Sequence, residues 1–245
     1  MISERSLVAN KLLGPENRTR VIRDGRWLIV KFPEPQSVVS WAIVRGGQVI
    51  ADTVASFQVD EAELIPPVDP VNFLKDELHR SGLSGAIGLM TSRQLDSYVD
   101  IEESYQGISV RAVVTAGLAN ALRAGDPPGT SGKIGTINVV CHVSVPLSEE
   151  AMLESMALAV EARTVAVLES GVTSRQTHLP ATGTGTDCLV IAAPVSKCGI
   201  KYAGKHTAIG HLIGSTVLKA TERGVAIWKC ERDSGLIGRR NLSRD

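Results

Sequence analysis

A glycine- and threonine-rich loop that ends on a carboxylate carries the strongest chemical signal in the chain. The loop reads Pro180-Ala-Thr-Gly-Thr-Gly-Thr-Asp187 and leads into the apolar run Cys188-Leu-Val-Ile-Ala-Ala193. Hydroxyls, flexible backbone amides and an acid therefore stand at the mouth of an expected buried strand. Such a loop is costly to order and adds little to a core, which favours a binding or catalytic role over an ordinary flexible turn.

Two nucleotide-binding sites that use glycine-rich loops do not fit this loop. A P-loop ends in Gly-Lys-Ser/Thr, whereas Gly185 is followed by Thr186 and Asp187. A dinucleotide-binding fingerprint needs a third glycine at a turn from a strand to a helix, whereas this loop precedes a strand. The composition of the loop therefore indicates a different ligand.

Glu161 and His206 are further candidates for proton transfer, and each also has an ordinary explanation. Glu150, Glu154 and Glu161 project along nearly one line of an expected helix, and such an acidic stripe usually faces water. His206 lies in a glycine-containing loop at an expected helix start. From there it could exchange protons with the Asp187 loop near neutral pH, or it could cap the helix.

Asn120 and Asn138 each stand close to glycine and threonine in the sequence. Their carboxamides could bind amide or carbonyl groups of a ligand, although closing a turn is the commoner use of such residues. Cys141 and His142 are adjacent in an expected strand. Their side chains therefore point to opposite faces and cannot form a pair of nucleophile and base.

The cysteines predict no metal site. Cys141, Cys188, Cys198 and Cys230 show no C-x-x-C spacing. The first two fall in expected strands, which favours reduced thiols in the core. A structural zinc site needs two close pairs of ligands, and the sequence contains none.

The segments around these residues predict both strands and helices. Runs rich in β-branched and aromatic residues predict strands, and apolar residues at helical spacing behind a serine or Asp-Pro cap predict helices. The predicted strands cover 27–32, 37–44, 49–57, 86–90, a pair around 98–115, 137–145 and 188–193, and the predicted helices cover 70–82, 148–171 and 207–223. This pattern indicates a single-domain α/β protein with a mixed, largely antiparallel sheet covered by packed helices.

The predicted strand 137–145 has two different faces. Ile137 and every second residue after it are apolar and belong to the core. The other face carries Asn138, Val140 and His142, and it meets either solvent or the floor of a pocket.

Length and composition set the remaining limits. The 245 residues fit one large domain, and 26 basic and 26 acidic residues give zero formal charge. No long-range field therefore favours DNA, RNA or an anionic membrane, and a small partner fits better.

The chain starts without a signal-peptide pattern and has no apolar run near the ~20 residues that span a bilayer, which predicts a cytoplasmic protein. We expect a flexible leader over residues 1–20, a domain over 21–224 and a C-terminal extension over 225–245.

Seven short segments occur in an order that is informative as a set. They are Val38-Val-Ser-Trp-Ala42, Gly88-Leu-Met-Thr91, Val114-Thr-Ala-Gly-Leu-Ala-Asn120, Gly135-Thr-Ile-Asn138, Glu161-Ala-Arg-Thr164, Ala181-Thr-Gly-Thr-Gly-Thr-Asp187, and Ala203-Gly-Lys-His-Thr207 with Ile209-Gly210 and Leu212-Ile-Gly214. Together they resemble the adenosylcobinamide amidohydrolase family, over about residues 21–224. Each segment is short, but seven in the right succession are hard to obtain by chance.

The resemblance implies hydrolysis of the amide that joins aminopropanol to a corrin-ring propionate, with release of adenosylcobyric acid in corrinoid salvage. Amide hydrolysis needs a base, donors for the tetrahedral oxyanion and an acid for the departing amine. Asp187 or Glu161 is then the expected base and His206 the expected proton donor. The amides around Gly183 to Thr186 are the expected oxyanion donors. A nucleophilic threonine, Thr184 or Thr186, is the rival mechanism.

The resemblance also implies a substrate site. Thr91, Asn120 and Asn138 are expected to bind peripheral carboxamides of the corrin, and the loop completes the site with Thr182, Gly183, Thr184, Gly185 and Thr186. The cobalt belongs to the substrate, so no separate cofactor is implied, and so large a substrate is compatible with a homo-oligomer. Asp187→Asn is expected to abolish turnover with the fold intact. The alternatives are an amidase for another amide and a corrinoid carrier without catalysis.

Overall fold

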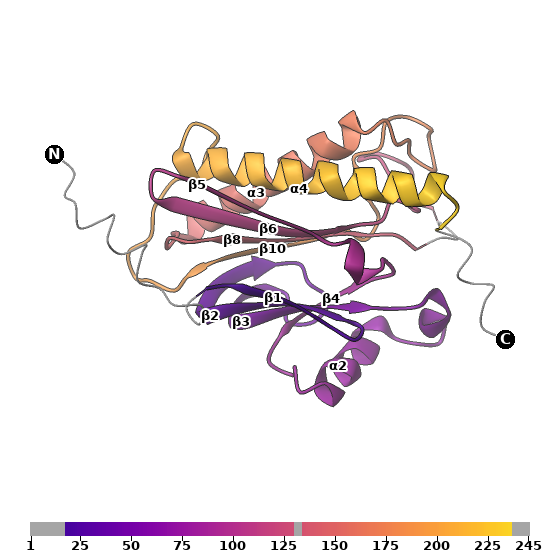
Figure 1. Cartoon of the computed structure of the whole chain (residues 1–245), viewed down its shortest axis with the longest axis horizontal. Coiled ribbons are helices and arrows are strands. Elements are labelled where there is room, and N and C mark those ends of the chain that lie inside the picture. Colours follow the sequence, from indigo (N-terminus) through magenta and orange to yellow (C-terminus); the bar gives the residue numbers. More distant parts are fainter. Residues whose placement is uncertain (1–17, 130–133, 237–245) are drawn as a thin grey trace.

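The computed structural model describes residues 18–129 and 134–236, which form an eight-stranded sheet and three α-helices (Figure 1). The strands of this sheet are β1 (Arg20–Asp24), β2 (Trp27–Ser40), β3 (Gly47–Gln58), β4 (Ile87–Thr91), β5 (Val99–Tyr105), β6 (Ile108–Ala116), β8 (Ile137–Val143) and β10 (Cys188–Pro194). Two short strands, β7 (Ala121–Leu122) and β9 (Gly183–Thr184), pair separately. The α-helices are α2 (Pro70–Arg80), α3 (Glu149–Glu169) and α4 (Ala208–Asp233), and two 3₁₀ helices cover Glu61–Leu64 and Leu95–Ser97.

The long strand β2 joins two halves of the sheet. Its first part pairs with β1 and β3, and its second part pairs with β3 and β10, with a shift in register between Lys31 and Gln36. Pro33 and Pro35 lie within this shift, where their missing N–H groups cost no ladder hydrogen bond. The strand order is β4-β3-β2-β10-β8-β6-β5, in which only β3–β4 and β8–β10 are parallel. The predicted mixed, largely antiparallel sheet is confirmed, but the strands predicted over 27–32 and 37–44 are one strand.

The two halves of the sheet face each other, and helices cover both outer faces (Figure 1). Helices α3 and α4 pack on the half formed by β5, β6, β8 and β10, and α2 packs on β3 and β4. A third core fills the space between the halves, with side chains such as Phe32, Val54, Val140 and Val190. The second face of β8, predicted to meet solvent or a pocket, therefore belongs mostly to this inner core.

Local signals explain where the helices start, but not where α4 ends. The Ser148 hydroxyl accepts a hydrogen bond from Ala151 N–H (3.2 Å) at the start of α3, and Asp69 caps α2. Helix α4 continues ten residues past the predicted end at Arg223, because Val225 and Trp228 continue its buried face. The extension predicted from residue 225 is thus helical up to Asp233. Residues 1–17 and 237–245, most of the predicted leader and the end of the extension, lie outside the described residues.

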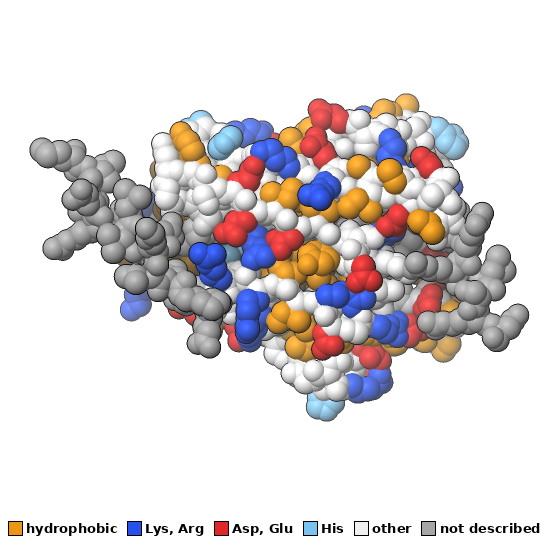
Figure 2. All heavy atoms as spheres, viewed as in Figure 1, with side chains coloured by type: hydrophobic (Ala, Val, Ile, Leu, Met, Phe, Trp, Pro, Cys, Tyr) orange, Lys and Arg blue, Asp and Glu red, His pale blue; other side chains and the backbone are white. Residues whose placement is uncertain are grey.

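Charges of both signs are mixed on the visible face of the molecule (Figure 2). On the face seen in Figure 2, acidic and basic side chains are interspersed with apolar ones, as the balanced composition predicts. In the described part of the chain, no helix has the length and apolar character needed to cross a membrane.

His142 of β8 is partly buried against Phe32, and its ring nitrogens contact the Gln36 Oε1 (3.3 Å) and Thr19 Oγ1 (3.2 Å) atoms. Burial, with a smaller contribution from the positive charge of Arg111, lowers the pKa of this imidazole from 6.5 to about 4. Because the unfolded chain binds this proton near pH 6.5 and the folded chain only near pH 4, stability is lost as the pH falls through that window.

We therefore expect the free energy of unfolding to fall by about 2 kcal/mol between pH 7 and pH 5 through this one group. Urea unfolding at the two pH values measures the difference. In His142→Gln the same pH change should cost clearly less. An equal loss in the variant and the wild type would assign the pH dependence to other groups.

Candidate active site

Asp187 lies buried just before β10, and its carboxylate receives four donors. The Asp187 side chain is 6% exposed and forms an ion pair with Arg163 of α3, whose side chain is 10% exposed. Its Oδ1 accepts from Ile137 N–H (3.0 Å) and from the Thr184 hydroxyl (2.5 Å). Its Oδ2 accepts from Arg163 and from Thr184 N–H (2.9 Å). The loop, β8 and α3 therefore converge on one carboxylate.

Glycine at position 183 lets Arg163 reach this carboxylate. A Cβ atom at Gly183 would overlap Arg163 Nη1 and Asp187 Oδ2. Arg163 Nη1 also donates to the carbonyl of Thr182 (3.0 Å), and β9 of the loop pairs with β7 on its other side. The pattern of glycine and threonine thus allows the backbone to wrap closely around a buried ion pair.

Neighbouring segments hold the rest of the loop in place. The Thr136 hydroxyl donates to Thr186 O (2.8 Å), and the Thr186 hydroxyl donates to Gly135 O (2.7 Å). Ala124 N–H donates to the Thr182 hydroxyl (2.8 Å). The threonines at 182 and 186 therefore bind protein groups, whereas the Thr184 hydroxyl is directed at the Asp187 carboxylate.

Thr91, Asn120 and Asn138 lie in the same region but are buried, with exposed fractions of 1%, 6% and 3%. Asn138 Nδ2 donates to Met90 O (2.9 Å). The Asn120 side chain lies against Gly135, where a Cβ atom would overlap Asn120 Oδ1. Asn138 therefore supports a neighbouring segment, whereas Asn120 Oδ1 has no hydrogen-bond partner among the described residues. Direct binding of a ligand by the three residues stays a prediction.

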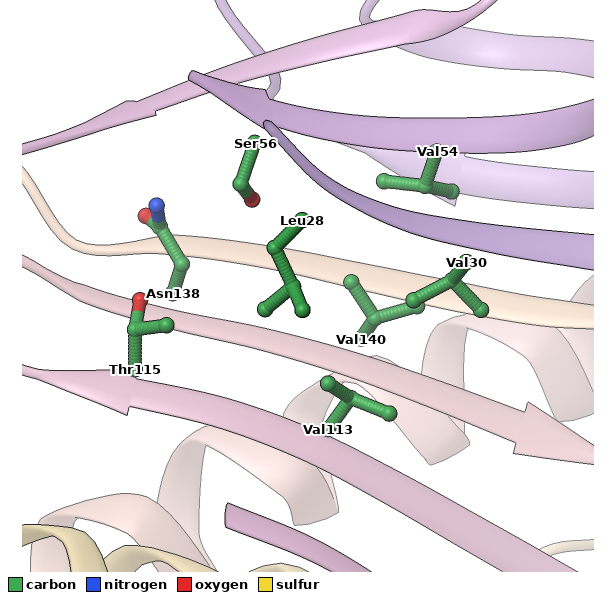
Figure 3. Close-up of a pocket in the computed structure, with 8 residues that line it drawn as sticks. All are labelled: Leu28, Val30, Val54, Ser56, Val113, Thr115, Asn138 and Val140. Atoms are coloured by element: carbon green, nitrogen blue, oxygen red, sulfur yellow. The ribbon is translucent and has the colours of Figure 1, made fainter. Parts of the chain in front are cut away.

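A small internal cavity lies beside Asn138, between the two halves of the sheet (Figure 3). Ser56, Thr115 and Asn138 lie toward one end of it, and Leu28 and four valines line the rest (Figure 3). Its volume of about 10 Å³ is on the order of one water molecule. Thr115 Oγ1 has no hydrogen-bond partner among the described residues. The cavity suits a water molecule and is too small for a larger ligand.

Six of the seven segments quoted above meet around Asp187. Besides the loop itself and Arg163, they contribute Trp41, whose indole N–H donates to Asp187 O (2.6 Å), and Gly117, whose N–H donates to Thr136 O (2.9 Å). Met90 joins through its carbonyl, which accepts from Asn138. Segments far apart in the sequence therefore form one connected site where β8 and β10 begin.

The structure does not bring Glu161 and His206 to Asp187. The Glu161 side chain is 53% exposed, pairs with Lys205, and projects about 200° around α3 from Arg163. His206 is exposed in the loop that precedes α4, which follows the opposite end of β10. This loop contacts α3 at two places: the Glu154 carboxylate accepts from Ala203 N–H (2.8 Å), and Lys205 pairs with Glu161. The expected contact of Glu161 and His206 with Asp187 is absent among the described residues, and the catalytic roles of Glu161 and His206 stay predictions.

Arg163 is the residue of the site that sequence reasoning missed. A signal was present, because Arg163 shares a helix face with Ala159, Ala162 and Ala166, which are all buried. A charged residue on the apolar face of a helix needs a buried partner. The acidic stripe on the opposite face drew attention to Glu161 instead.

The two cysteines near the site are poorly suited to act as nucleophiles. Burial raises the pKa of the Cys188 thiol, next to Asp187, to about 12, and burial raises the pKa of Cys141 to about 12 as well. Neither thiol is therefore an effective nucleophile near neutral pH. All four cysteines are unpaired. Over residues 18–129 and 134–236, no three His, Cys, Asp or Glu side chains are grouped as metal ligands.

Known proteins that resemble the chain include two archaeal ones. The chain is 28% identical over 194 residues to the adenosylcobinamide amidohydrolase of Methanosarcina mazei, covering 75% of this chain and 88% of the relative. It is 27% identical over 228 residues to an uncharacterized protein of Methanocaldococcus jannaschii, covering 82% and 86%. Among solved structures, a Burkholderia sp. β-aminopeptidase matches with a TM-score of 0.45 and 12% identity, covering 86% of this chain and 82% of that one.

A family model covers most of the sequence. The model for adenosylcobinamide amidohydrolase matches residues 12–233, which include every segment quoted above and the whole of α4. The match also extends beyond both predicted boundaries of the domain. The chain therefore belongs to the adenosylcobinamide amidohydrolase family and is an amidohydrolase.

Proposed function

We propose that this amidohydrolase cleaves the amide between aminopropanol and a corrin-ring propionate in adenosylcobinamide, releasing adenosylcobyric acid in corrinoid salvage. The family match over residues 12–233 and the name of the Methanosarcina mazei relative support this substrate. The observation that carries the proposed chemistry is the hydrogen bond of the Thr184 hydroxyl to the Asp187 carboxylate (2.5 Å).

Thr184 is the proposed nucleophile, and Asp187 is its base. A hydroxyl nucleophile is activated by an adjacent base that a third group orients, and Arg163 is that third group here. Thr184 Oγ1 attacks the amide carbonyl carbon while its proton passes to Asp187. The C–N bond then breaks and the proton moves on to the departing amine. Water hydrolyses the resulting ester, and its proton returns through Asp187 to Thr184.

Direct activation of water by Asp187 fits the geometry less well. Each oxygen of the carboxylate already accepts two hydrogen bonds, so a water molecule would have to displace one of them. The Thr184 hydroxyl needs no such rearrangement. The geometry therefore favours the threonine mechanism over a water-activating carboxylate.

Gly185 is the proposed oxyanion donor. It is exposed, and its N–H makes no hydrogen bond within the described residues. Thr184 N–H, by contrast, is bound to Asp187. An amide next to the nucleophile that points to solvent can donate to the oxyanion as the carbonyl is attacked.

The reaction is tested by incubating the protein with adenosylcobinamide and analysing the products by mass spectrometry. Free aminopropanol and a new ring carboxylate are expected in equal amounts. Binding of the substrate without either product would indicate a corrinoid carrier. Release of amine from a panel of simple amides, with no action on adenosylcobinamide, would indicate another amidase.

Glu161→Gln and His206→Ala are expected to leave kcat and KM of this reaction within about threefold of the wild type. Both side chains are exposed and lie away from the Thr184–Asp187 pair, and a true acid or base contributes about 10²-fold or more. Steady-state release of aminopropanol measures the effect. A hundredfold loss in either variant would place that residue in the active assembly, for example through a second subunit.

We propose that the enzyme needs no cofactor of its own, because each proton in the proposed steps moves between Thr184, Asp187, water and the substrate. Prolonged dialysis against a chelator is expected to leave turnover unchanged. Loss of activity that added zinc or another divalent metal restores would contradict this. A cytoplasmic location agrees with the four unpaired cysteines.

A further inference from the structure

Trp41 is the one tryptophan of the chain that is exposed to solvent. It is 46% exposed, whereas Trp27 and Trp228 are 7% and 5% exposed. It lies in the loop between β2 and β3, which also exposes Ile43 (39%). A large aromatic ring in water contributes little to folding, so its position calls for another explanation.

The loop holds this ring in a defined place. The indole N–H donates to Asp187 O (2.6 Å). Val44 of the same loop forms two backbone hydrogen bonds with Gly88, at 3.3 and 3.0 Å. The ring is therefore tied to the active-site loop, and the segment that carries the ring is tied to β4. An exposed but anchored side chain has already lost the freedom that binding would otherwise cost.

The anchor also connects the ring to the residue that binds the Thr184 hydroxyl. The backbone carbonyl that holds Trp41 and the carboxylate that holds Thr184 both belong to Asp187. An apolar surface on the substrate that packs on the indole would thus bring its neighbouring amide close to Thr184.

We propose that Trp41 is a specificity-determining residue, whose ring packs against the broad apolar surface of the corrin macrocycle and orients the scissile amide toward Thr184. This inference rests on the proposed function of the site. Small amides have no such surface, so Trp41 would favour a macrocyclic substrate over them. The indole N–H keeps the ring in place, and the ring itself makes the contact.

The test compares Trp41→Ala, Trp41→Phe and the control Tyr202→Ala. Tyr202 is also an exposed aromatic residue (68%), but it lies past the opposite end of β10. Trp41→Ala is expected to raise KM for adenosylcobinamide by about tenfold and to leave kcat within about threefold. Trp41→Phe keeps a ring and should recover most of the loss in KM. Tyr202→Ala should behave as the wild type.

Equilibrium dialysis with cobinamide separates failure of this inference from failure of the proposed function. If the wild type binds cobinamide but hydrolyses nothing, the proposed reaction is wrong. Even then, weaker binding of cobinamide by Trp41→Ala than by the wild type and Tyr202→Ala would support the contact. Unchanged KM and unchanged binding in Trp41→Ala would overturn the inference. A fall in kcat at constant KM in both Trp41 variants would also overturn it, since Trp41 would then act only by holding Asp187.

Discussion

Thr184→Ala is expected to lower kcat for adenosylcobinamide hydrolysis by about 10³-fold or more, because loss of a nucleophile removes the covalent route and leaves only binding and oxyanion stabilisation. The folded state should change little. The variant loses one hydrogen bond to Asp187 (2.5 Å), a contribution of about 1 kcal/mol or somewhat more for a charged acceptor. Release of aminopropanol and thermal unfolding, measured on the same samples, separate the two effects.

Two further variants sharpen this result. Thr184→Ser keeps the hydroxyl and should retain a measurable fraction of the activity. Thr186→Val removes a neighbouring hydroxyl that donates to Gly135 O (2.7 Å) and should cost far less in kcat. Rapid quenching followed by intact-protein mass spectrometry should reveal an ester at Thr184 in the wild type. Activity above about a tenth of the wild type in Thr184→Ala would return the mechanism to a water-activating base.

Local chemistry explains the parts of the fold that the sequence predicted well. The serine before two acidic residues predicted the start of α3, and the Ser148 hydroxyl does accept from Ala151 N–H (3.2 Å). Asp69 and Pro70 predicted the start of α2 in the same way. Such caps depend on residues within one helical turn, so a single sequence contains the information needed.

Pairing between distant segments was much harder to predict. The shift in β2 between Lys31 and Gln36 looks like the end of one strand and the start of another, although both parts pair with β3. The second face of β8 carries Asn138 and His142, a pattern also typical of a solvent-facing strand. Only the other half of the same sheet makes this face internal, and period-2 alternation does not show which strands lie opposite it.

In the candidate site, too, local features were predicted from the sequence and contacts between distant segments were not. The loop from Thr182 to Asp187 was predicted from its composition, and six segments do meet around it. The order of segments along the chain does not show how far apart they lie in space, however. The segment with His206 follows the other end of β10. Helical spacing shows that Glu161 and Arg163 lie on different faces of α3, but not which face meets the loop. The sequence therefore pointed to Glu161 as a site residue, and Arg163 was overlooked.

Asp187→Asn is expected to abolish turnover and also to destabilise the protein by about 3–5 kcal/mol, because it leaves the buried Arg163 guanidinium without its counter-ion. The sequence alone suggested that the fold would stay intact. The structure changes that expectation, since both side chains of the pair are at most 10% exposed. Urea unfolding measures the loss of stability, and aminopropanol release measures turnover. An unfolding free energy within about 1 kcal/mol of the wild type would show that the pair is not structurally important.

A double-mutant cycle separates the structural and catalytic contributions of this pair. Arg163→Met alone leaves a buried carboxylate uncompensated and should cost about as much stability as Asp187→Asn. The double variant buries no charge, so it should be more stable than either single variant. It should nevertheless be inactive, because no base remains for the Thr184 hydroxyl. Recovery of stability without recovery of turnover would thus assign Asp187 both functions, whereas an active double variant would exclude it from the chemistry.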